Sequence, residues 1–200
     1  MSTELAAPQI SRFLLGKTRI FAAWIFGLIL VFTAREYPTL PGIVLCFLGA
    51  TLRYWASGFL RKDNRPAVGG PYAWVRNPLY LGTYLMAVGA TLSIENWILL
   101  AVVTVFFAVI YHFVILAEEI KLREIFGAPY LNYCTLVPRF FPRPWPATQE
   151  SLKVVNPEMS HHRFCAALAS KNKAFEAYAT FAVIIFGVSA IAFTWKTWLL

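Results

Sequence analysis

The stretch GGPYAWVRNPLYLG, residues 69–82, lies between two strongly apolar runs and decides how the chain must fold. Its Gly-Gly-Pro start predicts a turn. Asn77 and Pro78 then predict the first residues of a helix, because Asn is a favoured N-cap and Pro fits the first helical position. The stretch therefore predicts a connector that leads directly into an apolar helix.

Three further side chains in this stretch, Tyr72, Arg76 and Tyr80, have no role in a turn or a helix cap. An arginine beside a helix N-terminus is suited to a carboxylate or phosphate ligand, because the helix end offers N–H groups and the guanidinium offers a fork of donors. The pattern indicates a binding site at the start of the helix.

The composition indicates an integral membrane protein. Of the 200 residues, 58% are hydrophobic and only 14% are charged, and the mean hydropathy is +0.58. A soluble domain of this size rarely carries so little charge. The net charge of +8 does not indicate nucleic acid as a partner, because the basic residues lie at the ends of apolar runs, as membrane flanks do. The cysteines form no CxxC pair, so no disulfide framework or structural zinc site is expected.

The pattern of apolar runs predicts an all-α membrane protein of about five transmembrane helices, because about 20 apolar residues span the hydrocarbon core. The runs are 16–34, 40–60, 78–94, 97–117 and 177–195. The first run is interpreted as a retained span rather than a signal peptide, because Glu4 precedes it and no small-residue cleavage site follows. His112, in the fourth run, is expected to be a packed or hydrogen-bonded interior histidine rather than a ligand.

Lysines and arginines predict the orientation, because they concentrate in cytoplasmic loops. They are dense in the N-terminus, in the loop 61–77 and in the segment 118–176, whereas the opposite loops carry few. We therefore expect these three segments to be cytoplasmic and the C-terminus to lie outside.

The segment 115–146, ILAEEIKLREIFGAPYLNYCTLVPRFFPRPWP, carries a second group of polar residues. The helix that starts at Trp97 meets no breaker before Gly127, a typical residue just past a helix end. Thirty residues reach about 45 Å, so this helix should project beyond the hydrocarbon core. Pro-rich sequence follows, so the chain is expected to fold back onto residues 69–80 and to form a pocket there.

Ionisable residues at the membrane boundary are costly and are often functional. Glu118 and Glu119 lie there, although Glu119 and Arg123 are also spaced to form a plain surface pair. Arg53 raises the same question, with a snorkelling arginine as the alternative. In the expected pocket, tyrosines would stack on a ligand, glutamates would bind a cation or ribose hydroxyls, and arginines would bind an anion.

Two motifs together resemble a known family. GPYxxVRNPLYLG (70–82) is followed by EExxLxxxFGxxYxxYxxxVPRFxP (118–142), and LRYWASGFLRKD (52–63) precedes both. This order and spacing resemble the superfamily of isoprenylcysteine carboxyl methyltransferases and phospholipid N-methyltransferases over about residues 49–146. The resemblance implies a cytoplasmic pocket for S-adenosyl-L-methionine and methyl transfer to a lipid-like substrate that enters from the bilayer. The chain has no acidic-GxGxG strand–turn, so a soluble Rossmann-type methyltransferase is not indicated.

The resemblance also implies roles for individual residues. Arg76 is expected to meet the cofactor carboxylate, and Glu119 the ribose or the amino group. The expected cofactor-binding residues are Tyr72, Arg76, Asn77, Pro78, Tyr80, Gly82, Glu119, Leu122 and Arg139. The expected catalytic residues are Glu118, Tyr130 and Tyr133.

Two departures from the family pattern limit what is carried over. Many relatives have His where this chain has Asn77, and a neutral amide carries no proton, so no general base is assigned there. A carboxylate acceptor is already deprotonated, whereas an amine acceptor would lose its proton to Glu118 or Tyr133. The tail 147–200 matches neither motif, and its His161-His162 pair and Cys165 offer too few ligands for a metal site.

The sequence divides into an N-terminal part (1–48), a methyltransferase core (49–146) and an extension with an extra transmembrane helix (147–200). It leaves the acceptor open between a phospholipid amine and a prenylcysteine-like carboxylate, and it leaves a homodimer open without a GxxxG pattern to support one. Two other classes stay as alternatives: an NADPH-dependent reductase related to sterol reductases, and a non-catalytic lipid-binding membrane protein.

Overall fold

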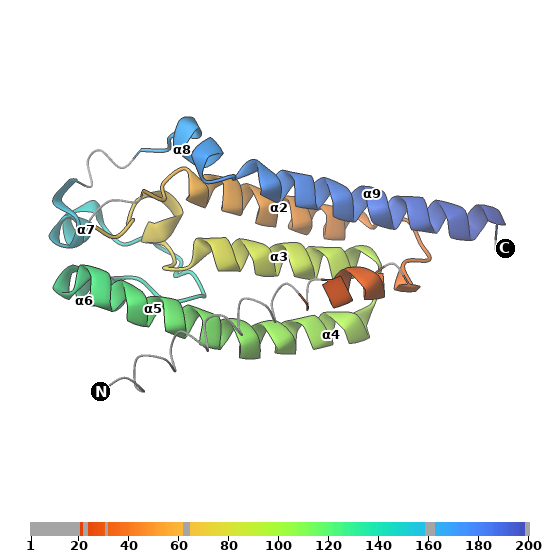
Figure 1. Cartoon of the computed structure of the whole chain (residues 1–200), viewed down its shortest axis with the longest axis horizontal. Coiled ribbons are helices and arrows are strands. Elements are labelled where there is room, and N and C mark those ends of the chain that lie inside the picture. The colour runs from red at the N-terminus through yellow and green to blue at the C-terminus, as the bar shows by residue number, and fades with distance from the viewer. Residues whose placement is uncertain (1–20, 22–23, 31, 62–64, 159–162, 199–200) are drawn as a thin grey trace, which may run out of the picture.

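The computed structural model describes residues 21, 24–30, 32–61, 65–158 and 163–198, and this part of the chain is helical without strands. The helices α2 (Leu40–Ser57), α3 (Pro78–Ser93), α4 (Trp97–Phe106) and α9 (Phe175–Trp198) run along the long axis of the molecule (Figure 1). The short elements η1 (Gly70–Ala73), α6 (Ala128–Leu136), α7 (Gln149–Val155) and α8 (Ala166–Lys171) gather at one end of this bundle. The expectation of an all-α fold is confirmed.

Glycines bring α2 and α3 into close contact. A Cβ on Gly49 would lie 2.6 Å from the Gly82 carbonyl oxygen, and one on Gly89 would lie 2.4 Å from the Cys46 nitrogen. The two backbones can approach this closely only because small residues face each other across the helix pair. The packing holds the start of α3 beside the end of α2, where Arg53 and the following loop lie.

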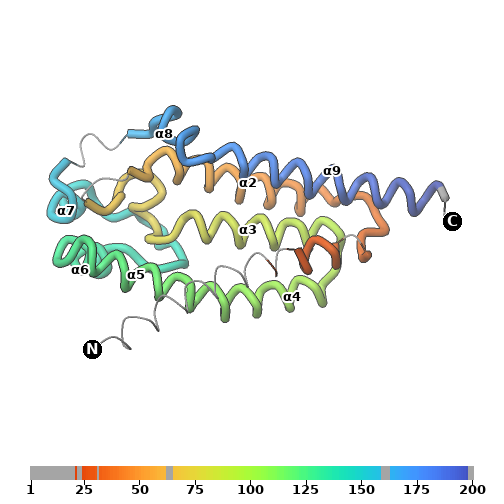
Figure 2. Tube along the Cα trace, viewed as in Figure 1, coloured from red at the N-terminus to blue at the C-terminus, as the bar shows by residue number. Residues whose placement is uncertain are grey.

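The predicted long helix is present as one continuous helix made of α4, the π-helical segment η2 (Phe107–Tyr111) and α5 (His112–Phe126) (Figure 2). It ends at Gly127, whose φ of 58° suits glycine, as predicted. The prediction for His112 is wrong, because its side chain is exposed on the surface of this helix. α3 also begins at Pro78 as predicted, but the Asn77 side chain does not cap it.

Among the described residues, three helical stretches are long and apolar enough to cross a membrane: Leu40–Ser57, Trp97–Phe126 and Phe175–Thr197. α3 has only 16 residues, about 24 Å, which is shorter than a hydrocarbon core of about 30 Å. Of the expected first span, 16–34, residues 16–20, 22–23 and 31 lie outside the described residues. The arrangement of five spans therefore stays a prediction.

The outer faces of these helices carry large apolar side chains. Ile98 is 80% exposed, Phe186 74% and Val183 72%. Isolated exposed apolar residues are ordinary, but continuous apolar faces on helices of membrane-spanning length are suited to lipid. The protein is a membrane protein, with its short elements at one end of the bundle.

Candidate active site

Arg76 ties the two sequence motifs together. Its Nε and Nη2 donate to Glu119 Oε1 at 3.0 and 2.8 Å, and its Nη1 donates to the carbonyls of Cys134 and Val137 at 2.8 and 2.7 Å. Its backbone N–H donates to the Pro138 carbonyl. One arginine therefore fixes the start of α3 against both α5 and the end of α6, and the predicted meeting of the two motifs is confirmed.

Glu119 is fully buried and holds a second arginine. Arg139 donates from Nε and Nη2 to Glu119 Oε2 at 3.1 and 2.9 Å, while Arg123 lies 3.9 Å from the same oxygen. Paired, hydrogen-bonded charges are the form in which a carboxylate tolerates burial. The surface pair of Glu119 with Arg123, considered from the sequence, is thus a minor part of a buried cluster.

Asn77 joins the same framework from the α3 side. Its Nδ2 donates a hydrogen bond of 3.0 Å to the Arg139 carbonyl, and Asn77 is buried. The amide thus links the start of α3 to the segment after α6 instead of accepting a hydrogen bond from the first turn of α3. A tertiary partner outcompetes the local cap that the Asn-Pro pair predicted.

A cavity of about 340 Å³ opens beside this framework. The volume lies in the range of about 300–1,000 Å³ that is usual for small-molecule sites. Its wall comes from the end of α2, residues 60–61 and 65–67, η1, the start of α3, α5 and α6. The lining residues are Arg53, Leu60, Arg61, Arg65, Pro66, Ala67, Tyr72, Arg76, Asn77, Pro78, Leu79, Tyr80, Glu118, Leu122, Phe126, Tyr130 and Tyr133.

Most of the residues expected at the site line this cavity, and three do not. Gly82 serves the contact between α3 and α2, where a Cβ would lie 2.7 Å from the Gly49 carbonyl oxygen. Glu119 lies behind the wall, with both oxygens engaged by arginines, and Arg139 lines a different cavity. The structure therefore separates the carboxylate that faces the cavity, Glu118, from the buried one that organises it.

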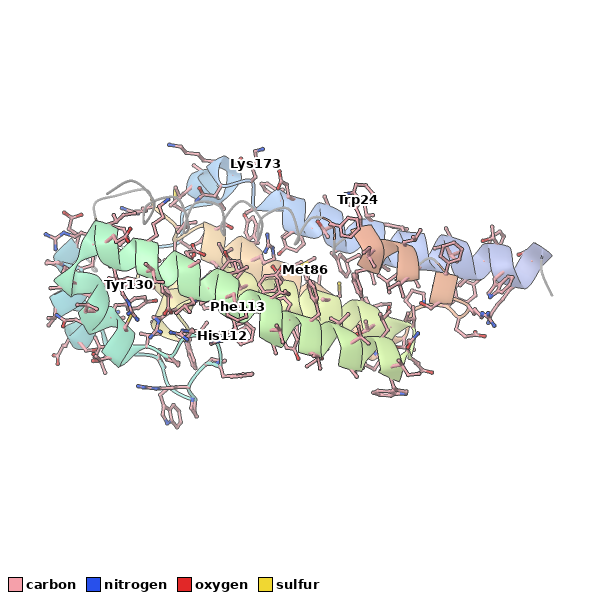
Figure 3. The ribbon with its side chains drawn as sticks, turned by 60° about the horizontal axis from the view of Figure 1, so that its bottom comes forward. Trp24, Met86, His112, Phe113, Tyr130 and Lys173 are labelled. Carbon is pink, nitrogen blue, oxygen red and sulfur yellow. The ribbon has the colours of Figure 1, made fainter. Side chains whose placement is uncertain are left out.

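Glu118 accepts a 2.7 Å hydrogen bond from the Tyr80 hydroxyl. Glu118 is exposed and lines the cavity, whereas Glu119 is held in buried ion pairs with Arg76 and Arg139. Tyr133 and Tyr130 are buried on α6, at the end of the bundle where Figure 3 shows Tyr130. The Tyr133 hydroxyl donates a hydrogen bond of 2.6 Å to the Tyr72 carbonyl. This contact closes the cavity on the η1 side.

The hydroxyl of Tyr72 is the buried side-chain polar atom without a hydrogen-bond partner among the described residues. Such an atom costs about 1–3 kcal/mol unless something else pairs with it. Because Tyr72 lines the cavity, a polar ligand group in the cavity is the natural partner.

Burial controls the protonation of the three tyrosines. Burial raises the pKa of Tyr72, and the nearby Glu118 carboxylate raises it further. Burial likewise raises the pKa of Tyr130 and of Tyr133 well above the ordinary value. All three phenols are therefore neutral near pH 7 and act there as hydrogen-bonding groups.

Sequence reasoning missed the contribution of the loop that follows α2, in which Arg61 and Arg65 line the cavity. The basic residues of this loop served only to predict orientation. A signal was present, because LRYWASGFLRKD precedes the first motif and Arg53 within it also lines the cavity.

The tail, which matched no motif, holds this loop in place. Asn172 donates from Nδ2 to the carbonyls of Ser57 and Leu60 at 2.9 and 2.8 Å. Asn156, buried at the end of α7, donates 3.2 Å to the Pro66 carbonyl. Through these residues the tail packs against the core.

Comparison with known proteins decides the family. A family model described as phospholipid methyltransferase matches residues 21–129, more than half of the chain. The chain belongs to the phospholipid methyltransferase family. The matched region contains the first motif, the long helix with Glu118 and Glu119, and Gly127, which supports the family resemblance seen in the sequence. The framework around Arg76 extends beyond it to Arg139.

Two curated relatives are named for metal resistance. The cobalt-zinc-cadmium resistance protein CzcN of Cupriavidus metallidurans is 29% identical over 67% of this chain and 58% of its own length. The nickel-cobalt-cadmium resistance protein NccN of Alcaligenes xylosoxydans xylosoxydans is 31% identical over 51% of this chain and 47% of its own. The chain thus spans about half the length of the curated relatives it matches. No solved structure matches it.

The described residues contain no group of three or more His, Cys, Asp or Glu side chains that could hold a metal ion. His161 and His162, weighed above as metal ligands, lie outside the described residues, and Cys165 is a half-buried free thiol.

Proposed function

We propose that the protein transfers a methyl group from S-adenosyl-L-methionine to the polar head of a membrane-embedded amphiphile. The observation that carries the proposal is the cavity of about 340 Å³ whose wall combines both motifs and contains the unpaired hydroxyl of Tyr72. Membership of the phospholipid methyltransferase family supports the reaction class.

The donor set of the cavity fits this cofactor. Arg61 and Arg65 suit the carboxylate of its amino acid end, because guanidinium groups bind carboxylates with paired hydrogen bonds. Glu118 suits the ribose hydroxyls or the ammonium group. Leu122 and Phe126 provide an apolar surface for the adenine. When bound, the cofactor supplies a methyl group on a sulfonium cation.

This assignment replaces two roles expected from the sequence. All three side-chain nitrogens of Arg76 donate hydrogen bonds to other groups of the protein. We therefore assign Arg76 to positioning rather than to binding the cofactor carboxylate. Glu119 is fully buried between Arg76 and Arg139, so the role at the ribose or amino group passes to Glu118.

The side chains of the site position the reactants and handle a proton. Tyr130 and Tyr133 exclude water from one wall of the cavity, which favours the approach of an acceptor to the methyl group. Their raised pKa keeps both phenols protonated, so Tyr133 is no longer a proton acceptor in our proposal. An amine acceptor would lose its proton to Glu118, which lines the cavity and is exposed.

The acceptor is a phospholipid amine or a prenylcysteine-like carboxylate. In this proposal it enters from the bilayer, and the cavity end of the bundle is cytoplasmic. Incubation of vesicle-embedded protein with methyl-labelled S-adenosyl-L-methionine and each lipid separates the two acceptors. A methyl ester is released by mild base, whereas a methylated amine is not, and no labelled lipid from either class would refute the proposed acceptors.

Cofactor binding is tested first, by equilibrium binding of S-adenosylhomocysteine and by thermal stabilisation, with NADPH as the control ligand. Glu118→Gln should weaken S-adenosylhomocysteine binding about tenfold or more, because a hydrogen bond to a charged group is lost. Glu124→Gln, on the exposed face of the same helix, is the matched control and should leave binding unchanged. Stabilisation by NADPH alone would favour the reductase, and stabilisation by neither ligand would favour a non-catalytic lipid-binding protein.

A further inference from the structure

A second cavity, of about 230 Å³, lies beside the long helix and shares no lining residue with the first. Its wall combines η2 and the start of α5 with Tyr84 of α3 and residues 139–141, where the chain folds back. Figure 3 shows His112 on the side of the long helix that faces this returning segment. The cavity is therefore formed by tertiary packing around the π-helical segment, a type of local distortion that is frequent at functional sites.

This second cavity adjoins an apolar cleft of about 330 Å³. Both are lined by Phe107 and Tyr111, whose rings stack with centroids 3.6 Å apart. The cleft runs between α4, α3 and the helical residues 25–29 of the N-terminal segment. Its wall is almost entirely aliphatic and aromatic, as an acyl chain requires.

The other end of the second cavity is basic. Arg139 lines it and uses one edge of its guanidinium, Nε and Nη2, for Glu119. The edge formed by Nη1 and Nη2 remains suited to a second, bidentate acceptor such as a phosphate. Because Arg76 and Arg139 both hold Glu119 and Arg123 lies 3.9 Å from it, three guanidinium groups surround one carboxylate and the cluster keeps a positive charge.

The depth of each part matches the layers of a bilayer. With Trp97 at one boundary and 1.5 Å per residue, the cleft begins about 3 Å inside at Leu99 and ends about 21 Å inside at Tyr111. His112 lies at about 22 Å and Glu119 at about 33 Å, on the two sides of the far edge of a hydrocarbon core of about 30 Å. The apolar cleft thus lies at the depth of acyl chains and the Arg139 cluster at the depth of headgroups.

We propose that the second cavity and the apolar cleft together bind one phospholipid, with its phosphate on Arg139 and an acyl chain between α3 and α4. The Glu119 carboxylate fixes the orientation of Arg139 in advance, which lowers the cost of ordering this side chain on binding. The ring of Tyr80, which lines the first cavity, contacts the ring of Tyr111 with centroids 5.5 Å apart. The bound lipid therefore lies one aromatic pair away from the proposed methyl-donor cavity.

The test is lipid binding to the detergent-purified full chain, measured by native mass spectrometry without a methyl donor. The ligands are phosphatidylglycerol, a diacylglycerol with the same chains, and inorganic phosphate. Phosphatidylglycerol should bind at least about tenfold more tightly than the diacylglycerol, because only it offers an anion to Arg139. Inorganic phosphate at millimolar concentration should not displace it, because the acyl chain contributes most of the buried surface.

Two variants locate the site, and one controls for surface charge. Arg139→Gln should reduce the preference for phosphatidylglycerol over diacylglycerol to about one. Ala108→Trp, at an exposed position in the wall of the second cavity, should weaken both lipids without disturbing the protein core. Arg143→Gln, at an exposed arginine that donates to the Leu136 carbonyl, should keep the preference.

Equal binding of the two lipids to the unaltered chain would overturn the proposal. So would an unchanged preference in Arg139→Gln, an equal loss of preference in Arg143→Gln, or an Ala108→Trp variant that binds both lipids normally. If Arg139→Gln does not fold, Ala108→Trp and the comparison of lipids still decide. Because no methyl donor is present, the result is independent of whether the first cavity binds S-adenosyl-L-methionine.

Discussion

The replacement of Glu119 by Gln is the most informative perturbation of the framework. In the native chain this fully buried carboxylate accepts two hydrogen bonds from Arg76 and two from Arg139. The amide keeps the shape but has one accepting oxygen, so it can serve only one of the two arginines and turns its NH2 group toward the other. The variant therefore leaves a buried guanidinium without a counter-charge.

The size of the effect follows from the burial of the two arginines. Removing one partner of a buried ion pair costs about 3–5 kcal/mol. The Arg76 side chain is only 8% exposed, so the loss of its ion pair destabilises the protein by nearly the full amount. Arg139 is 35% exposed, so solvent compensates for part of the loss of its ion pair. Because Gln keeps one acceptor and Arg76 keeps its two carbonyl partners, we expect a loss near the lower limit, about 3 kcal/mol.

Thermal unfolding in detergent measures this loss. For a chain of this length, 1 kcal/mol lowers the melting temperature by about 2–4 °C, so Glu119→Gln should lower it by about 6–12 °C. Glu124→Gln, on the exposed face of the same helix, should change stability by less than about 0.5 kcal/mol. A Glu119→Gln variant as stable as the control would show that the buried cluster does not hold the motifs together.

Three further outcomes are expected. Tyr72→Phe should leave the melting temperature unchanged or raise it, because it removes an unpaired buried hydroxyl, but it should weaken S-adenosylhomocysteine binding; a variant that binds normally would exclude this hydroxyl as a ligand contact. Gly82→Ala should destabilise the protein by about 1–3 kcal/mol, because its Cβ would meet the α2 backbone, whereas Gly187→Ala, with open space around it, should not; equal melting temperatures would contradict the close packing of α2 and α3. The raised pKa values of Tyr72, Tyr130 and Tyr133 keep these phenols protonated in the folded protein above pH 10, where the unfolded chain loses its phenolic protons. The free energy of unfolding should therefore fall as pH rises, by up to about 4 kcal/mol per pH unit. A flat pH profile in denaturant titrations up to about pH 11 would refute these shifts.

Local rules predicted several elements correctly because their causes lie within a few residues. The long helix from Trp97 to Phe126 follows from an uninterrupted run of helix-compatible residues, and its end follows from a glycine that adopts positive φ. The start of α3 at Pro78 follows from the Asn-Pro pair. The same rules gave the wrong partner for the Asn77 amide, because a carbonyl from residue 139 competes with the helix end.

The candidate site was predictable only as far as its motifs reach. The pairing of residues 69–82 with 115–146 followed from the need of a Pro-rich chain to fold back, and the structure confirms this contact. The tail was unassigned because Asn156 and Asn172 act through backbone carbonyls, and a carbonyl leaves no trace in the residue types of the loop that it belongs to.

The sequence by itself determined that this is a helical membrane protein with two motifs of the phospholipid methyltransferase family, because hydropathy, helix signals and motif spacing are properties of the chain alone. Only the tertiary structure decided which of two adjacent glutamates faces the cavity. Glu118 and Glu119 have the same chemistry, but successive residues on a helix point about 100° apart, so one meets Tyr80 at the cavity and the other is buried between Arg76 and Arg139. That difference depends on which elements pack against each face, and residues far apart in the sequence supply those elements.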